Sequence, residues 1–193
     1  MIKTSQMLLK EYSNYAKPYD KINRLVKAGE LIPIVKGLYE TNRSTPAHYL
    51  AGSICGPSYL SFEFALSYYG LIPEAVYTFT SATFCKRKTK KFETPFGFYS
   101  YQDVPEQAYP FGIKINNENG YSFHIATPEK ALCDKLYSLS PLQNQSELQY
   151  LLFEDLRIDE NEFAKLNKQD IELLAEKYKS TNVSLLAKYI RRI

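Results

Sequence analysis

The sequence predicts an α+β protein in which an N-terminal winged-helix-like unit is followed by a mixed α/β domain with antiparallel strands and a C-terminal helical segment. Three observations lead to this prediction. Two helical patterns precede a small β-hairpin pattern within residues 1–45, strand patterns separated by turn residues fill about 76–126, and helical patterns dominate 127–193. We therefore expect two domains, residues 1–45 and 46–193.

The composition is that of a globular protein. A chain of 193 residues with 45% hydrophobic and 23% charged residues can bury a core without metals or disulfides. No apolar stretch approaches the ~18 residues of a membrane span, and no secretory signal is evident, so a cytoplasmic protein without a membrane partner is expected. Cys55, Cys85 and Cys133 match no zinc spacing and are expected to be reduced and buried. The 17 Tyr and 11 Phe are expected mainly in a core.

Two short helices are predicted at the N-terminus. The first spans about Thr4 to Tyr12, and the second about Pro18 to Ala28, because proline suits a first helical turn and Gly29 tolerates the left-handed conformation after a helix. In the second helix Ile22, Leu25 and Val26 form an apolar stripe, which places its cations on the opposite, solvent-facing side.

A β-hairpin is predicted directly after these helices, with strands at 31–35 and 38–40 around Lys36-Gly37. Helix, helix and hairpin is the element order of a winged helix, whose cationic face reads DNA. Residues 1–45 carry eight Lys or Arg against four acidic residues, so this region holds most of the net positive charge. The candidate DNA-binding residues are Lys17, Lys21, Asn23, Arg24, Lys27, Lys36 and Arg43.

The second domain is predicted to begin with two helices within residues 47–70, divided by Gly56-Pro57, with Ser58 as the N-cap of the second helix and Gly70 at its end. Strands are then predicted at 76–84, at 92–103 with an interruption at 95–97, at 111–115 and at 121–126, with Asn119-Gly120 as a hairpin turn. Thr127-Pro128 indicates a helix start, and further helices are predicted at 146–156, 170–178 and 183–190.

No motif for catalysis or cofactor binding is evident. His48 and His124 lie outside any nucleophile–base pattern, and the chain has neither a phosphate-binding glycine loop nor an Asp-x-Asp pair. The acidic group at 159–162 falls at a predicted helix start, where the helix dipole accounts for it. We therefore expect no enzymatic activity, no cofactor and no metal site.

Each basic feature has two interpretations. The cations of the second helix are either a solvated face or a DNA contact, and the hairpin that follows favours the contact. The basic run between two predicted strands is either a solvated loop or a loop that binds a partner or phosphate, and the sequence leaves this open. The run consists of Lys86, Arg87, Lys88, Lys90 and Lys91.

Three stretches resemble the AbiEi antitoxin family of type IV abortive-infection toxin–antitoxin systems. Residues 22–31 with Lys36-Gly37-Leu38-Tyr39 are similar to the family's winged-helix end. The block Gly-Pro-Ser-Tyr-Leu-Ser at 56–61, with its continuation to Pro73, and the block Ala-Thr-Pro-Glu-Lys-Ala-Leu-Cys-Asp at 126–134 resemble its C-terminal domain. The likeness spans most of residues 18–140, and only the three-helix winged-helix unit is shortened.

The resemblance implies an antitoxin that represses its own operon. Its expected partners are operator DNA, bound by the N-terminal domain, and a cognate nucleotidyltransferase-type toxin, counteracted by the C-terminal domain through direct binding, modification or indirect antagonism. The chain lacks the Gly-Ser and paired aspartates that such a toxin needs. The alternatives are a protein-interaction module without DNA binding and an enzyme acting on nucleic acid. A monomer is expected, since no long apolar helix stripe remains for a dimer seam.

Overall fold

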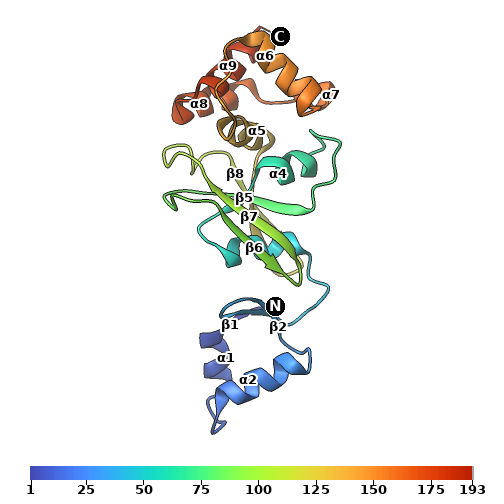
Figure 1. Ribbon diagram of the computed structural model, residues 1–193, viewed down its shortest axis with the longest axis vertical. Helices are drawn as coiled ribbons and strands as arrows, with labels where there is room; N and C mark the ends of the chain where they lie inside the picture. Colours follow the sequence, from blue (N-terminus) through green and yellow to red (C-terminus); the bar gives the residue numbers. More distant parts are fainter. Residues whose placement is uncertain (193) are drawn as a thin grey trace.

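The N-terminal unit consists of two short helices and a three-stranded antiparallel sheet in the computed structural model, which describes residues 1–192 (Figure 1). Its elements are β1 (Ile2–Thr4), α1 (Ser5–Glu11), α2 (Pro18–Lys27), β2 (Ile32–Val35) and β3 (Leu38–Glu40). The Thr4 hydroxyl caps α1 by accepting from the Met7 amide, and Gly29 has a φ of 76° after α2. The predicted helices and hairpin are confirmed, whereas β1, which pairs with β3, was not expected.

A small core holds this unit together. Leu8 of α1 packs with Ile22 and Leu25 of α2 and with Leu31, and all four are buried. Ile34 of β2 and Leu38 of β3 belong instead to the large core of the rest of the chain. The sheet of the N-terminal unit therefore faces the second domain, while α2 is on the far side, at one end of the molecule (Figure 1).

The remainder of the chain forms a six-stranded sheet and a set of helices. The strands are β4 (Tyr59–Leu60), β5 (Thr78–Thr83), β6 (Lys90–Thr94), β7 (Gly97–Asp103), β8 (Ile113–Glu118) and β9 (Tyr121–Ala126). The helical elements are η1 (Ala47–Leu50), α3 (Ala51–Ile54), α4 (Phe62–Tyr68), α5 (Pro128–Tyr137), α6 (Gln145–Tyr150), the π-helical turn η2 (Leu151–Asp155), α7 (Glu160–Ala164), α8 (Lys168–Tyr178) and α9 (Thr181–Ile190). The C-terminal helices gather at the end of the molecule opposite α2 (Figure 1).

The large sheet has the strand order β6-β7-β5-β4-β9-β8. The expectation of antiparallel strands is correct only in part, because β5 pairs with β7 and β4 pairs with β9 in parallel. Parallel partners are distant in sequence, and no local turn signal announces them. The hairpin of β8 and β9 turns at Asn119-Gly120 as predicted, but β8 extends to Glu118, because both turn residues have positive φ and two residues close the turn.

Ser58 is not a helix N-cap, which corrects the sequence prediction. Tyr59 and Leu60 form strand β4 between β5 and β9, where Leu60 aligns with Ser81 on one side and Ile125 on the other. The sheet thus begins before residue 76, and α4 starts only at Phe62. The backbone groups of Tyr59 and Leu60 therefore pair with strands β5 and β9, although the apolar spacing of this segment is also typical of a helix.

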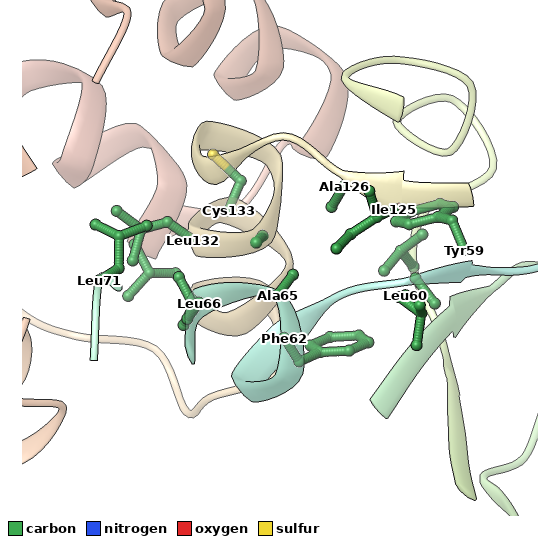
Figure 2. Close-up of a cluster of buried hydrophobic side chains, with 14 of the residues drawn as sticks. Tyr59, Leu60, Phe62, Ala65, Leu66, Leu71, Ile125, Ala126, Leu132 and Cys133 are labelled. Atoms are coloured by element: carbon green, nitrogen blue, oxygen red, sulfur yellow. The ribbon is translucent and has the colours of Figure 1, made fainter. Parts of the chain in front are cut away.

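Most aromatic side chains pack in the interior, as expected. The core at the junction of β4, β9, α4 and α5 includes Tyr59, Leu60, Leu66, Ile125 and Leu132 (Figure 2). Tyr99 and Tyr101 of β7 are also buried, and their hydroxyls donate to backbone carbonyls of the η1–α3 segment. The three cysteines are free, but Cys85 is exposed, because it lies in the turn after β5 with a φ of 55°.

Glu40 joins the N-terminal unit to the second domain. Its carboxylate is fully buried and accepts hydrogen bonds from the amides of Thr41 (2.8 Å) and Asn42 (3.0 Å), from the Tyr121 hydroxyl of β9 (3.0 Å) and from the Met1 amino group. Burial alone would raise the pKa of this carboxyl, but the hydrogen bonds outweigh burial and lower the pKa below its usual value. The charged form is therefore the one that the fold stabilises.

Replacing Glu40 with glutamine should make the free energy of unfolding depend less steeply on pH in the acidic range. A carboxyl with a lowered folded-state pKa contributes stability above its unfolded pKa and loses it as the pH falls through the folded value. The natural protein should thus lose stability below about pH 4.5 more steeply than Glu40→Gln, which should be less stable by about 1–3 kcal/mol at neutral pH. Urea unfolding across this pH range measures both, and parallel curves would contradict the role of Glu40.

Candidate functional site

The exposed face of α2 brings together three of the predicted DNA-contacting residues. Asn23, Arg24 and Lys27 are exposed, while Ile22 and Leu25 are buried beneath them. The three exposed residues and Asp20 line a shallow hollow of about 370 Å³. The periodicity of the sequence thus places the cations toward solvent at the far end of the molecule (Figure 1).

The other predicted contacts lie around this face. Lys17 precedes α2 and is exposed, as are Lys36 in the β2–β3 turn and Arg43 in the linker. Lys21 is half-buried, with its Nζ 5.6 Å from the centre of the Tyr15 ring. Within residues 1–192, none of these four cations or their neighbours Arg24 and Lys27 forms an ion pair with an acidic side chain. Their charge is therefore available to a ligand.

The basic run at 86–91 belongs to the second domain, and its end is part of a strand. Lys90 and Lys91 are in β6, whereas Arg87 and Lys88 are exposed in the preceding turn. The turn is fixed at two points, because the Lys86 Nζ donates to the Gly56 carbonyl (3.2 Å) and the Arg87 amide donates to the Asp103 carboxylate (2.6 Å). These two hydrogen bonds therefore anchor the loop that contains the first part of the basic run.

The two C-terminal blocks that carry the family resemblance meet in one buried polar network. Asp134 of α5 accepts from the Ser61 hydroxyl (2.5 Å), from the Tyr59 hydroxyl (3.1 Å) and from the Tyr178 hydroxyl of α8. Lys130, one helical turn before Asp134, donates to the Tyr178 hydroxyl (2.6 Å), and its Nζ is 3.5 Å from the Asp134 carboxylate. These residues are buried, so both blocks contribute to the fold rather than to an open site.

The network is an ion pair completed by neutral donors. Burial raises the pKa of the Asp134 carboxyl and lowers the pKa of the Lys130 ammonium, so desolvation opposes the charged forms of both groups. Their mutual attraction and the hydroxyl donors favour the charged forms. Sequence reasoning missed this cluster, although the spacing of four residues between Lys130 and Asp134 on one helix was a visible signal.

An open groove lies over β5, β6 and β7, on the same side of the sheet as α4. Its volume is about 810 Å³, and Tyr77 and Phe98, exposed at 83% and 54%, line it with Lys91 and Glu93. Glu63 of α4 also lines the groove and pairs with Lys135 of α5 at 2.5 Å. The sequence analysis placed most aromatic residues in the core. Phe98 of β7 is exposed instead, because successive residues of a strand face opposite sides of the sheet.

The two histidines lie in different surroundings. His48 is half-buried against the rings of Tyr49 and Phe123, with ring centres 4.4 and 5.0 Å away, and burial lowers its pKa. His124 is exposed on β9. Over residues 1–192 no three His, Cys, Asp or Glu side chains are grouped so that they could hold a metal ion.

Comparisons with known proteins report on the fold. No family model and no curated protein sequence matches the chain. Among solved structures, the chain is similar to the crystal structure of the RV2827C protein from Mycobacterium tuberculosis, with a TM-score of 0.62 and 15% identity over 98% of this chain and 71% of that one. At this identity the likeness supports the α+β fold alone. None of the helices within residues 1–192 combines the length and apolar character needed to cross a membrane.

Proposed function

We propose that this protein binds DNA through the exposed face of α2 and acts as the antitoxin and autorepressor of a toxin–antitoxin operon. The observation that carries the DNA-binding part is the pairing of a buried apolar stripe on α2 with Asn23, Arg24 and Lys27 exposed opposite it. The hairpin of β2 and β3 follows directly and presents Lys36, which matches the element order of a shortened winged helix. Phosphate contacts by these cations would position the unit on DNA.

A titration of the full-length protein against the DNA upstream of its own gene tests this proposal. We expect saturable binding that weakens steeply as salt rises, because each neutralised phosphate releases counterions. Competition with unrelated DNA of equal length separates operator recognition from general attraction to phosphate. Absence of binding at low salt would remove the repressor part of the proposal.

The antitoxin part rests on the family resemblance, and we assign it to residues 46–193. Co-expression with the product of the neighbouring gene tests it without assuming a mechanism. We expect growth to be restored when that product is toxic, and the charge-reversed α2 variant Arg24→Glu/Lys27→Glu should still restore it. Failure of the natural protein to restore growth would remove the antitoxin part and leave the DNA-binding part to its own test.

A protein-interaction module without DNA binding is the second candidate function. The groove with exposed Tyr77 and Phe98 favours it, since aromatic residues are enriched at protein interfaces. Restored growth combined with no DNA binding would support this function over the first.

A further inference from the structure

Strand β8 is an open edge of the large sheet. It pairs with β9 alone, whereas the opposite edge strand, β6, lies beside β2 of the N-terminal unit. Within residues 1–192, no segment other than β9 forms a hydrogen bond with the backbone of 113–118. An edge strand of six residues with free backbone groups is a template for another strand.

The turn at Asn119-Gly120 determines which backbone groups of β8 face outward. Because two residues with positive φ close the turn, Glu118 and Tyr121 form a hydrogen-bonded pair, and such pairs alternate along the hairpin. The even-numbered residues of β8 therefore direct their N–H and C=O groups toward β9. The odd-numbered residues, among them Ile115 and Asn117, direct theirs toward the open edge.

An apolar side chain is exposed in the middle of this edge. Ile115 is 62% exposed, and it lies opposite His124 of β9, which is also exposed. This part of the sheet face is therefore open to solvent. An exposed apolar residue on an unpaired edge strand favours association with another strand.

The charges of β8 are complementary to those of a second copy of the same strand. Lys114 and Glu118 are exposed, and neither forms an ion pair within residues 1–192. When two copies pair antiparallel about a two-fold axis at Asn116, Lys114 of each copy lies opposite Glu118 of the other. The Glu118 Oε2 accepts from the Tyr49 hydroxyl (2.8 Å), which leaves Oε1 for the lysine.

The same register also satisfies the backbone and the apolar side chain. Ile115 of one copy lies opposite Asn117 of the other, and because both direct their backbone groups outward, they exchange both N–H···O bonds. The two Ile115 side chains lie diagonally across the axis on one face, within reach of each other. A register that placed Ile115 opposite itself would put Lys114 opposite Asn116, so the charges select the register centred on Asn116.

We propose that this protein forms a two-fold dimer in which the β8 strands of two copies pair antiparallel and join their sheets into one. The sequence predicts a monomer because no apolar helix stripe remains for a dimer seam, but a strand edge needs no such stripe. The surface contains no residue of α2, so the proposal does not depend on the proposed DNA-binding function. Because a single strand pair is a small interface, we expect a micromolar dissociation constant.

Sedimentation velocity of the full chain at about 1–500 µM tests the proposal over the range of weak interfaces. We expect the natural protein to shift from monomer to dimer as the concentration rises. Lys114→Glu and Glu118→Lys each place like charges opposite one another at both symmetric positions, so each should raise the dissociation constant about tenfold or more. An equimolar mixture of these two variants should form heterodimers, and the double variant should dimerise as the natural protein does, because both restore opposite charges.

Two further variants separate strand pairing from overall charge. Asn117→Pro removes an outward N–H but none of the bonds between β8 and β9, so it should weaken the dimer and change the melting temperature of the monomer little. Lys168→Glu, on the exposed face of α8, makes the same charge change as Lys114→Glu and should leave the dissociation constant unchanged. Thermal unfolding at low concentration checks that each variant is folded.

Three results would overturn the proposal. A monomer at every concentration would leave the β8 edge to a strand of another protein. A dimer that the β8 variants do not weaken, or that Lys168→Glu weakens equally, would place the interface elsewhere. Absence of heterodimers in the mixture of Lys114→Glu and Glu118→Lys would contradict the pairing of these two residues across the axis.

Discussion

Replacing Asp134 with alanine should lower the free energy of unfolding by about 3–5 kcal/mol, the effect of removing one partner of a buried ion pair. The substitution leaves the Lys130 ammonium buried without a counter-charge and removes the acceptor of the Ser61, Tyr59 and Tyr178 hydroxyls. Because small domains are stable by only about 5–15 kcal/mol, this is a large share of the total. Urea unfolding of the full chain measures it.

Three further variants show whether the buried charge causes this loss. Tyr178→Phe removes one bridging hydroxyl and should lower stability by about 1–3 kcal/mol. The double variant Lys130→Met/Asp134→Leu should be more stable than Asp134→Ala, since neither charge remains buried. Lys135→Met breaks the partly exposed pair with Glu63 and should change stability by at most about 1 kcal/mol. A loss in Asp134→Ala no larger than in Lys135→Met would refute the prediction.

This network joins the 56–61 and 126–134 blocks of the second domain. Tyr59 and Ser61 come from the 56–61 block, and Lys130 and Asp134 come from the 126–134 block, 70 residues later. Their side chains join β4, α5 and α8 in the interior. These two blocks therefore pack the sheet against the C-terminal helices. Surface chemistry, which determines partners, lies elsewhere.

Local signals predicted most of the elements. The Thr127 hydroxyl caps α5 as expected, Gly29 and Gly70 follow helices with positive φ, and Asn119-Gly120 closes a hairpin. Each of these depends on the conformational preferences of a few neighbouring residues. Strands β1 and β4 were missed because three and two residues carry no period, and only pairing with distant strands defines them. The parallel pairs were missed for the same reason.

The candidate site was predictable where it lies on one element. The exposed face of α2 follows from the 3.6-residue period, so Asn23, Arg24 and Lys27 could be grouped from the sequence. The small pocket between α3 and β9 could not, because its lining combines residues 49–58 with residues 122–124.

Reversing the charge of Arg24 and Lys27 together should weaken binding to the upstream DNA by about a hundredfold or more at low salt, since each contact is worth about 1–3 kcal/mol. Both side chains are exposed on α2 and lack an acidic partner within residues 1–192. Glutamates there would remove two phosphate contacts and add two repulsive charges. The plot of log affinity against log salt should become shallower by about 2, the slope of two contacts.

The reversal needs controls for fold and for net charge. Glutamates in the last turn of α2 oppose the helix dipole by about 0.3–1 kcal/mol each, so Arg24→Gln/Lys27→Gln serves as a milder variant that should also lose affinity. Lys168→Glu/Lys188→Glu makes the same change in net charge on exposed residues of α8 and α9. If binding depends on α2, this control should bind almost as tightly as the natural protein. Equal losses in both reversed variants would assign the attraction to overall charge, and unchanged affinity in the α2 variants would exclude α2 as the DNA-binding face.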